Sequence, residues 1–148
     1  MENVLWEFLY KKGYKKIKLK LTKTNHFEVI ATINGVKGLF ILDTGASSSC
    51  IGFNDIALFK LEAVPSNIKA TGAGSTNMLT QIASKNTIKI GTWKSNNVTL
   101  VLFDLTHVNT ALTMHKCKPV HGIIGADILN KGKAIIDYNK KYLYLKSL

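Results

Sequence analysis

The sequence contains no arginine, and all 20 basic residues are lysines, against nine aspartates and glutamates. The net charge of +11 points toward nucleic acid or an anionic surface as a partner. Arginine supplies the planar fork that reads phosphates and guanines, so its absence argues against a dedicated nucleic-acid-binding protein. In the densest lysine cluster, Lys16, Lys18 and Lys20 alternate with apolar residues, which is typical of a strand with one solvated face. A binding patch at this face is the alternative that remains open.

Cysteine and long apolar runs are also scarce. Cys50 and Cys117 are the two cysteines. The first apolar patch, residues 4–10, is too short for a membrane span, and its flanking charges are in the wrong order for a secretory signal. We therefore expect a cytoplasmic protein with free thiols and no membrane partner.

Residues 104–120 show no regular pattern, and with His121 they bring together several potential metal ligands. The spacing in sequence resembles that of metal ligands at His115, Cys117 and His121. The spacing matches no standard zinc motif, lacks a fourth ligand nearby and includes Pro119. We therefore expect neither a metal nor a cofactor.

Short apolar runs separated by turn signals predict one mostly β domain in this chain of 148 residues. Residues 1–24 form an N-terminal segment for packing or a dimer interface, and residues 25–148 form the main domain. Asn34-Gly35 predicts a tight hairpin turn. Asn54 is a candidate cap for a short helix. The predicted strands cover residues 15–24, 27–33, 36–42, 87–90 and 98–103, and a hairpin covers 134–145.

One stretch combines a buried strand with residues that can carry chemistry. The apolar residues 39–42 run directly into Asp43, Thr44 and Gly45. The strand thus delivers a carboxylate to its end, beside a glycine that lets another backbone come close. Asp-Thr-Gly is also an ordinary tight-turn sequence. The tripeptide alone leaves both interpretations open.

A weak internal repeat connects this stretch to Ile123-Ile124-Gly125-Ala126, where an apolar strand again runs into glycine but without the acid. Asp43-Thr44-Gly45-Ala46-Ser47 resembles the active-site motif of retropepsin-like (retroviral-type) aspartic proteases. The Ile-Ile-Gly copy and the short helical pattern after it resemble the second hydrophobic element of that fold. The closing hairpin is similar to the end of bacterial members. The resemblance covers roughly residues 25–146.

The resemblance implies a single-domain acid-protease β-barrel with one or two short helices, active as a two-fold dimer. An aspartic protease needs two carboxylates facing one water, one ionised as a base and one protonated as an acid. Because the chain has one such motif, we expect Asp43 to pair with its copy in a second chain. The resemblance implies that Thr44 braces the pair across the interface and that Gly45 permits the close backbone approach.

The resemblance also implies a set of peptide contacts. The glycines around residues 70–76 would form a flap that folds over an extended peptide, although they also fit an ordinary loose loop. Side-chain pockets would favour apolar residues beside the cut. The implied peptide-binding residues are Ala46, Ser47, Gly72, Ala73, Gly74 and Ile124.

Four positions depart from the family pattern or call for a structural explanation. Ser47 and Ala126 stand where retroviral enzymes commonly carry an Asp and an Arg, so no buried charge loses its partner. Ala46 offers no hydroxyl to the ionised pair, and we expect activity at mildly acidic to neutral pH. Asp127 opens a short helix, where exposed N–H groups favour a carboxylate, so we expect it to be structural.

Two classes of function follow. The first is a homodimeric aspartic endopeptidase that acts on peptides or proteins. The second is a peptide-binding or assembly module on the same fold, with little or no proteolysis. Anion or nucleic-acid binding by the lysine-rich face is a third, weaker option.

Overall fold

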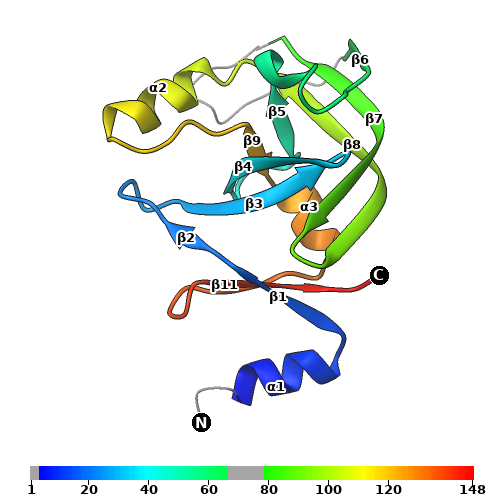
Figure 1. Cartoon of the computed structure of the whole chain (residues 1–148), viewed down its shortest axis with the longest axis vertical. Coiled ribbons are helices and arrows are strands. Elements are labelled where there is room, and N and C mark those ends of the chain that lie inside the picture. The colour runs from blue at the N-terminus through cyan, green and yellow to red at the C-terminus, as the bar shows by residue number, and fades with distance from the viewer. Residues whose placement is uncertain (1–3, 67–78) are drawn as a thin grey trace.

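The computed structural model describes residues 4–66 and 79–148, and its dominant feature is a β-barrel (Figure 1). Eight strands form one sheet in the order β2-β3-β4-β9-β5-β8-β7-β6, and an additional pairing of β3 with β7 joins the sheet to itself. The strands of this sheet are β2 (Lys20–Leu21), β3 (Phe27–Ile33), β4 (Val36–Leu42), β5 (Cys50–Gly52), β6 (Ala63–Pro65), β7 (Gln81–Ile90), β8 (Trp93–Phe103) and β9 (Gly122–Ile124).

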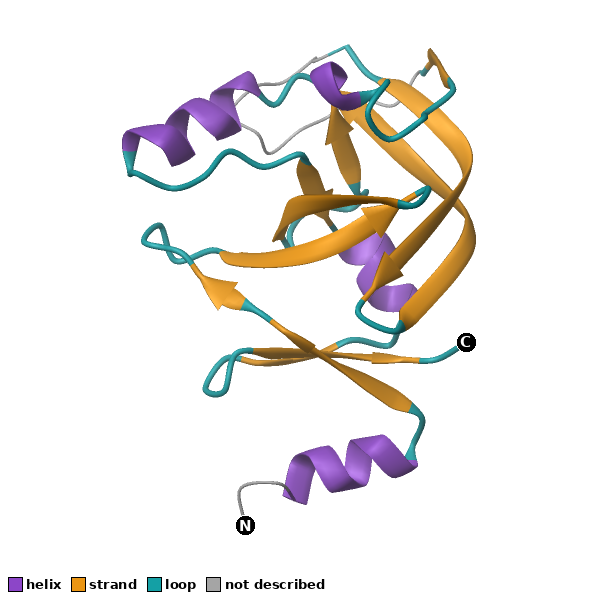
Figure 2. Ribbon diagram, viewed as in Figure 1, coloured by secondary structure: helices purple, strands orange, loops and turns teal. Residues whose placement is uncertain are grey.

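A second, three-stranded sheet lies between the barrel and the N-terminal helix (Figure 2). It contains β1 (Tyr14–Lys18), β11 (Tyr142–Lys146) and β10 (Ile135–Asp137), in that order. The described part of the chain holds three α-helices, namely α1 (Val4–Lys11), α2 (Thr106–Met114) and α3 (Ala126–Lys131), and one 3-10 helix, η1 (Phe53–Asp55). Helices α1 and α2 lie at opposite ends of the molecule (Figure 1).

The hairpin of β3 and β4 has the bounds that the sequence predicts. Asn34 and Gly35 both adopt positive φ angles, 50° and 86°, which is the geometry of a two-residue hairpin turn whose twist matches the strands. Ile33 pairs with Val36 across the turn. The prediction of a hairpin that leads directly to Asp43 is therefore confirmed.

Side chains alternate along β4, and the alternation creates two cores. Phe40 and Leu42 face the large cluster inside the barrel, which we call the main core. Leu39 and Ile41 face a smaller cluster on the other side of the sheet, which we call the second core. The strands at the centre of the barrel are therefore covered on both faces.

Several sequence predictions need correction. Residues 104–120, predicted to be irregular, contain α2, because Leu105, Val108 and Leu112 form one apolar face that covers the second core. Asn54 lies inside η1 instead of capping it. Strands β7 and β8 extend beyond the predicted runs, since most of their polar residues occupy solvated positions of long antiparallel strands, while Asn86 and Ser95 are buried.

Helix α1 packs on the small sheet, to which the same N-terminal segment contributes β1. The Leu9 side chain is buried, and the Trp6 ring stacks on that of Tyr144 with a centroid distance of 5.9 Å. None of the helices in the described ranges is long and apolar enough to cross a membrane.

Candidate active site

Asp43 lies at the end of β4, where that strand runs parallel to β9. Leu42 pairs with Ile124, and the Asp43 N–H donates to the Ile124 carbonyl oxygen at 2.9 Å. The Gly45 N–H donates to Asp43 Oδ1 at 2.9 Å, so the carboxylate also stabilises the turn in which it lies. Asp43, Thr44 and Gly45 are all exposed. The motif therefore presents a carboxylate on a turn fixed to two buried strands.

The second glycine element, Gly125 and Ala126, packs against this turn and is hydrogen-bonded to it. The Ala126 N–H donates to the Ala46 carbonyl oxygen at 2.7 Å. A Cβ at Gly125 would lie 2.6 Å from the same oxygen, so a side chain at this position would push the two segments apart. Within one chain, the close backbone approach therefore depends on Gly125.

A buried hydrogen-bond network connects the same two segments. Asp127 Oδ1 accepts hydrogen bonds from the Ser49 N–H, the Ser49 hydroxyl and the Ile128 N–H, at 2.9, 2.7 and 2.8 Å. The Ser49 hydroxyl oxygen accepts from the Gly125 N–H at 2.8 Å. The structural role expected of Asp127 is thus confirmed. Ser49 is not predictable from the sequence, because nothing in the run of three serines distinguishes the buried one.

The structure places the predicted peptide-binding residues in different environments. Ala46 is half-buried and Ser47 is exposed, both beside Asp43. Ile124 is 1% exposed and belongs to the main core, so its side chain cannot line a surface pocket. Ile123 is the strand residue that faces the second core instead. The predicted flap, with Gly72, Ala73 and Gly74, lies outside the described residues.

Four apolar side chains form a row across the sheet beside Asp43. Ile41 pairs with Ile123, Ile123 with Cys50, and Cys50 with Val101, on β4, β9, β5 and β8. All four belong to the second core. Burial, with smaller contributions from the negative charges of Asp127 and Asp43, raises the pKa of the Cys50 thiol to about 12. That effect of Asp43 is consistent with the row lying close to its carboxylate.

Helix α2 and the segment that follows it cover this row. Leu105, Val108 and Leu112 come from the helix and its start, and Val120 from the return segment. The Asn109 side chain joins the helix to the return segment by two hydrogen bonds. Its Nδ2 donates to the Val120 carbonyl at 3.0 Å, and its Oδ1 accepts from the Val120 N–H at 2.7 Å. A regular helix thus forms one wall beside the Asp43 face of the sheet.

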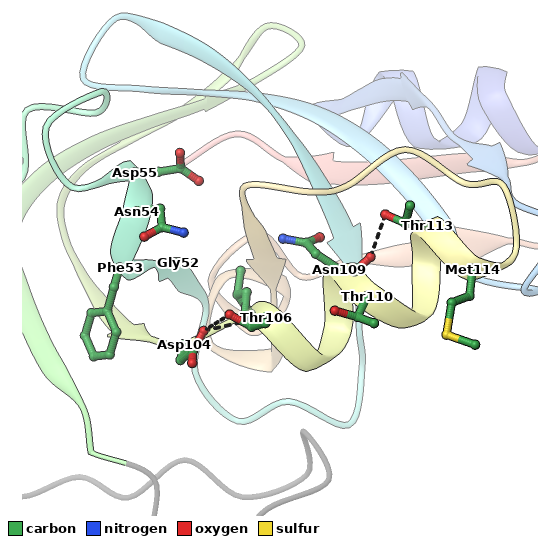
Figure 3. A pocket seen from close by; sticks show the side chains of 11 residues that line it. Gly52, Phe53, Asn54, Asp55, Asp104, Thr106, Asn109, Thr110, Thr113 and Met114 are labelled. Carbon is green, nitrogen blue, oxygen red and sulfur yellow. Dashed lines mark hydrogen bonds between the residues drawn. The ribbon is translucent and has the colours of Figure 1, made fainter.

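A pocket of about 460 Å³ lies between α2 and the segment Gly52–Asp55 (Figure 3). Its lining mixes polar and apolar side chains, and Thr106, Asn109 and Thr113 come from the helix. Hydrogen bonds from the hydroxyl and the N–H of Thr106 hold the pKa of Asp104 below its ordinary value. Within residues 4–66 and 79–148, none of the predicted site residues lines this pocket.

The residues spaced like metal ligands in the sequence make contacts of other kinds, and the Cys117 thiol donates to the His115 carbonyl oxygen at 3.7 Å. His121 Nδ1 accepts a hydrogen bond from the Leu39 N–H at 3.0 Å, and its ring packs edge-on against Phe59. His115 is exposed at the end of α2. No group of three possible metal-binding side chains occurs in residues 4–66 and 79–148.

Comparisons with known proteins agree with this geometry. A family model described as aspartyl protease matches residues 29–128. A retropepsin-like aspartic protease from Rickettsia conorii is 22% identical, with a TM-score of 0.59, and the match covers 89% of this chain and 90% of that one. The EIAV protease, solved with the inhibitor HBY-793, is 21% identical, with a TM-score of 0.58 and coverages of 80% and 98%.

A third solved structure extends the likeness to a eukaryotic protein. The retroviral protease-like domain of Ddi1 from Leishmania major is 16% identical, with a TM-score of 0.53 and coverages of 89% and 90%. A search of curated proteins gives no significant match. The solved structures share the retropepsin-like fold with this chain.

Proposed function

The chain belongs to the aspartyl protease family, and from that premise we propose that it is an aspartic endopeptidase whose active site forms when two copies of Asp43 meet in a homodimer. The observation that carries the proposal is the exposed Asp43 turn, fixed to the ends of two parallel strands. The second glycine element follows β9 as Asp43 follows β4, but it has Gly125 in place of the acid. A second chain is therefore the source of the second carboxylate.

In the proposed mechanism, the two carboxylates share one proton and hold one water between them. The ionised carboxylate accepts a proton from the water as its oxygen attacks the carbonyl carbon of the peptide bond. The protonated carboxyl group donates its proton to the carbonyl oxygen, which gives a tetrahedral diol. The diol collapses as its C–N bond breaks: the carboxyl group that took the proton of the water gives it to the nitrogen, one diol hydroxyl gives its proton back to the other carboxylate, and an acid and an amine leave.

Other parts of the proposal concern the surroundings of the pair. Thr44 of each chain braces the dyad across the interface, which suits its exposed position beside Asp43. The segment around residues 70–76 acts as the flap over a bound peptide or protein substrate. A cytoplasmic location fits the two cysteines, which are both free.

The direct test compares the wild type with Asp43→Asn on a mixed peptide library, with products identified by mass spectrometry. The amide cannot act as the base, so cleavage should fall by at least about 1,000-fold while the oligomer persists. Equal cleavage by both proteins would contradict the proposal. If neither protein cleaves and both bind the same peptides equally well, the chain is a peptide-binding module on this fold.

A further inference from the structure

The apolar row of Ile41, Ile123, Cys50 and Val101 lies next to Asp43 on the same face of the sheet. Asp43 follows Ile41 by two residues, so strand alternation directs both side chains to one side, about 7 Å apart along the strand. An extended peptide whose reacting carbonyl lies at Asp43 would place a neighbouring side chain over this row. The row thus has the position of a pocket floor.

The floor is already covered by the protein itself. Ile41, Ile123, Cys50 and Val101 are 5, 9, 3 and 6% exposed. The covering side chains come from α2 and its return segment, where Leu105, Leu112 and Val120 are each 4% exposed. Little room remains between the floor and this wall.

We propose that Leu112 and Val120 determine the specificity of the protease by filling this pocket from the side of α2. The inference rests on the proposed function and adds the substrate class. A peptide with a small apolar side chain, such as alanine, next to the cleaved bond is accepted. A peptide with phenylalanine at the same place meets the α2 wall.

Hydrogen bonds hold the wall in place, so a large side chain cannot simply displace it. Asn109 binds both backbone groups of Val120. The His121 N–H donates to the Leu39 carbonyl at 2.8 Å, and the Cys117 N–H to the Leu112 carbonyl at 2.8 Å. These contacts join the helix to the return segment and the return segment to the barrel, which favours a fixed wall over a mobile lid.

The test uses two fluorogenic peptides that share a sequence cleaved by the wild type and differ in one residue beside the cut, alanine or phenylalanine. Leu112→Ala removes the side chain that fills the pocket. We expect it to raise kcat/KM for the phenylalanine peptide relative to the alanine peptide by about 10-fold or more, the usual discrimination of a hydrophobic pocket. Leu112→Val, a milder truncation that preserves folding better, should shift the ratio in the same direction by less.

Leu129→Ala is the matched control, because it removes the same atoms from a buried leucine of another helix, in the main core. It should leave the peptide ratio unchanged. Cys50 supplies a readout that needs no catalysis: in a Cys117→Ala background, Leu112→Ala should speed its reaction with dithiodipyridine more than Leu129→Ala does.

The outcomes separate this inference from the proposed function. An unchanged peptide ratio in an active Leu112→Ala protein overturns the specificity role, even if Cys50 reacts faster. An unchanged Cys50 rate overturns the covering of the row by α2. Absence of any Asp43-dependent cleavage overturns the proposed function, and this inference with it.

Discussion

At the scale of single residues, Ser49 and Asp127 do as much to shape the site as the exposed Asp43 motif. Ser49 is fully buried, and its hydroxyl both donates to Asp127 and accepts from Gly125. The pair therefore fixes the distance between the Asp43 turn and the second glycine element. Asp43 itself is identified by its motif, whereas Ser49 is found only through its contacts.

Ser49→Ala should destabilise the protein by about 1–3 kcal/mol, because it leaves the Gly125 N–H and one bond of the Asp127 carboxylate unsatisfied in a buried place. Urea unfolding measures this change. Ser47→Ala, at an exposed position of the same loop, is the control and should have little effect. Equal losses in the two variants would contradict the assigned network.

Cys50 makes the stability depend on pH in the alkaline range. Its thiol has a pKa raised from 9.0 to about 12 by burial, while in the unfolded chain it ionises near the ordinary value. The folded state then holds the proton longer, so the free energy of unfolding falls as the pH rises from 9.0 toward about 12. Below that range the thiol contributes no pH dependence.

Cys50→Ala removes this group, so its free energy of unfolding should fall less than that of the wild type between about pH 8 and pH 10, by about 1 kcal/mol. Urea unfolding of both proteins at the two pH values measures the difference. Lysines and tyrosines titrate in both proteins and cancel in the comparison. Parallel pH curves would show that Cys50 is accessible to water.

At the scale of elements, local sequence signals predict some parts of the fold well and others poorly. The hairpin of β3 and β4 follows from Asn34-Gly35 and the apolar runs on either side, because turn chemistry and alternation act within a few residues. Helix α2 was missed because its threonines and β-branched residues favour no helix by themselves. The helix is stabilised where its apolar face packs on the second core, and that core forms only when β5, β8 and β9 come together.

The residues of the candidate site could likewise be predicted only in part from the sequence. The repeat in the sequence brings Asp43 and Gly125 together correctly, but it does not say which side of β9 faces the site. The sequence pattern predicts Ile124 as a peptide-binding residue, whereas in the structure Ile124 lies in the main core and Ile123 lies in the second core with Ile41. The row beside Asp43 depends on the pairing of four strands that lie apart in the sequence. The residue pattern of each strand does not indicate which strands pair.

Asn34 also holds the hairpin to the rest of the barrel, beyond forming its turn. Its side chain donates to the Phe59 carbonyl and to Asn86, and accepts from the Thr87 N–H. Asn34→Gly keeps the backbone angle but loses these bonds, and we expect a loss of about 2 kcal/mol in urea unfolding. Asn25→Gly is the control, since Asn25 also has a positive φ, 62°, but is exposed at its turn. Equal losses of stability in the two variants would show that the loss comes from backbone entropy alone and not from the side-chain hydrogen bonds.

At the scale of the whole molecule, the account requires a second copy of the chain. One chain presents one exposed carboxylate of the required kind, and a two-fold axis near Asp43 would supply the other. Light scattering at micromolar concentration should therefore give the mass of two chains. A strict monomer that still cleaves peptides would show that the second carboxylate comes from elsewhere in the same chain.

The most direct measurement mixes wild-type and Asp43→Asn chains in equal amounts, allows them to exchange, and records peptide cleavage at constant total protein. If both Asp43 residues of a dimer are needed, only pairs of two wild-type chains are active, and activity falls to about a quarter of that of the pure wild type. If each chain carries its own complete site, activity falls to about one half, and the account is contradicted.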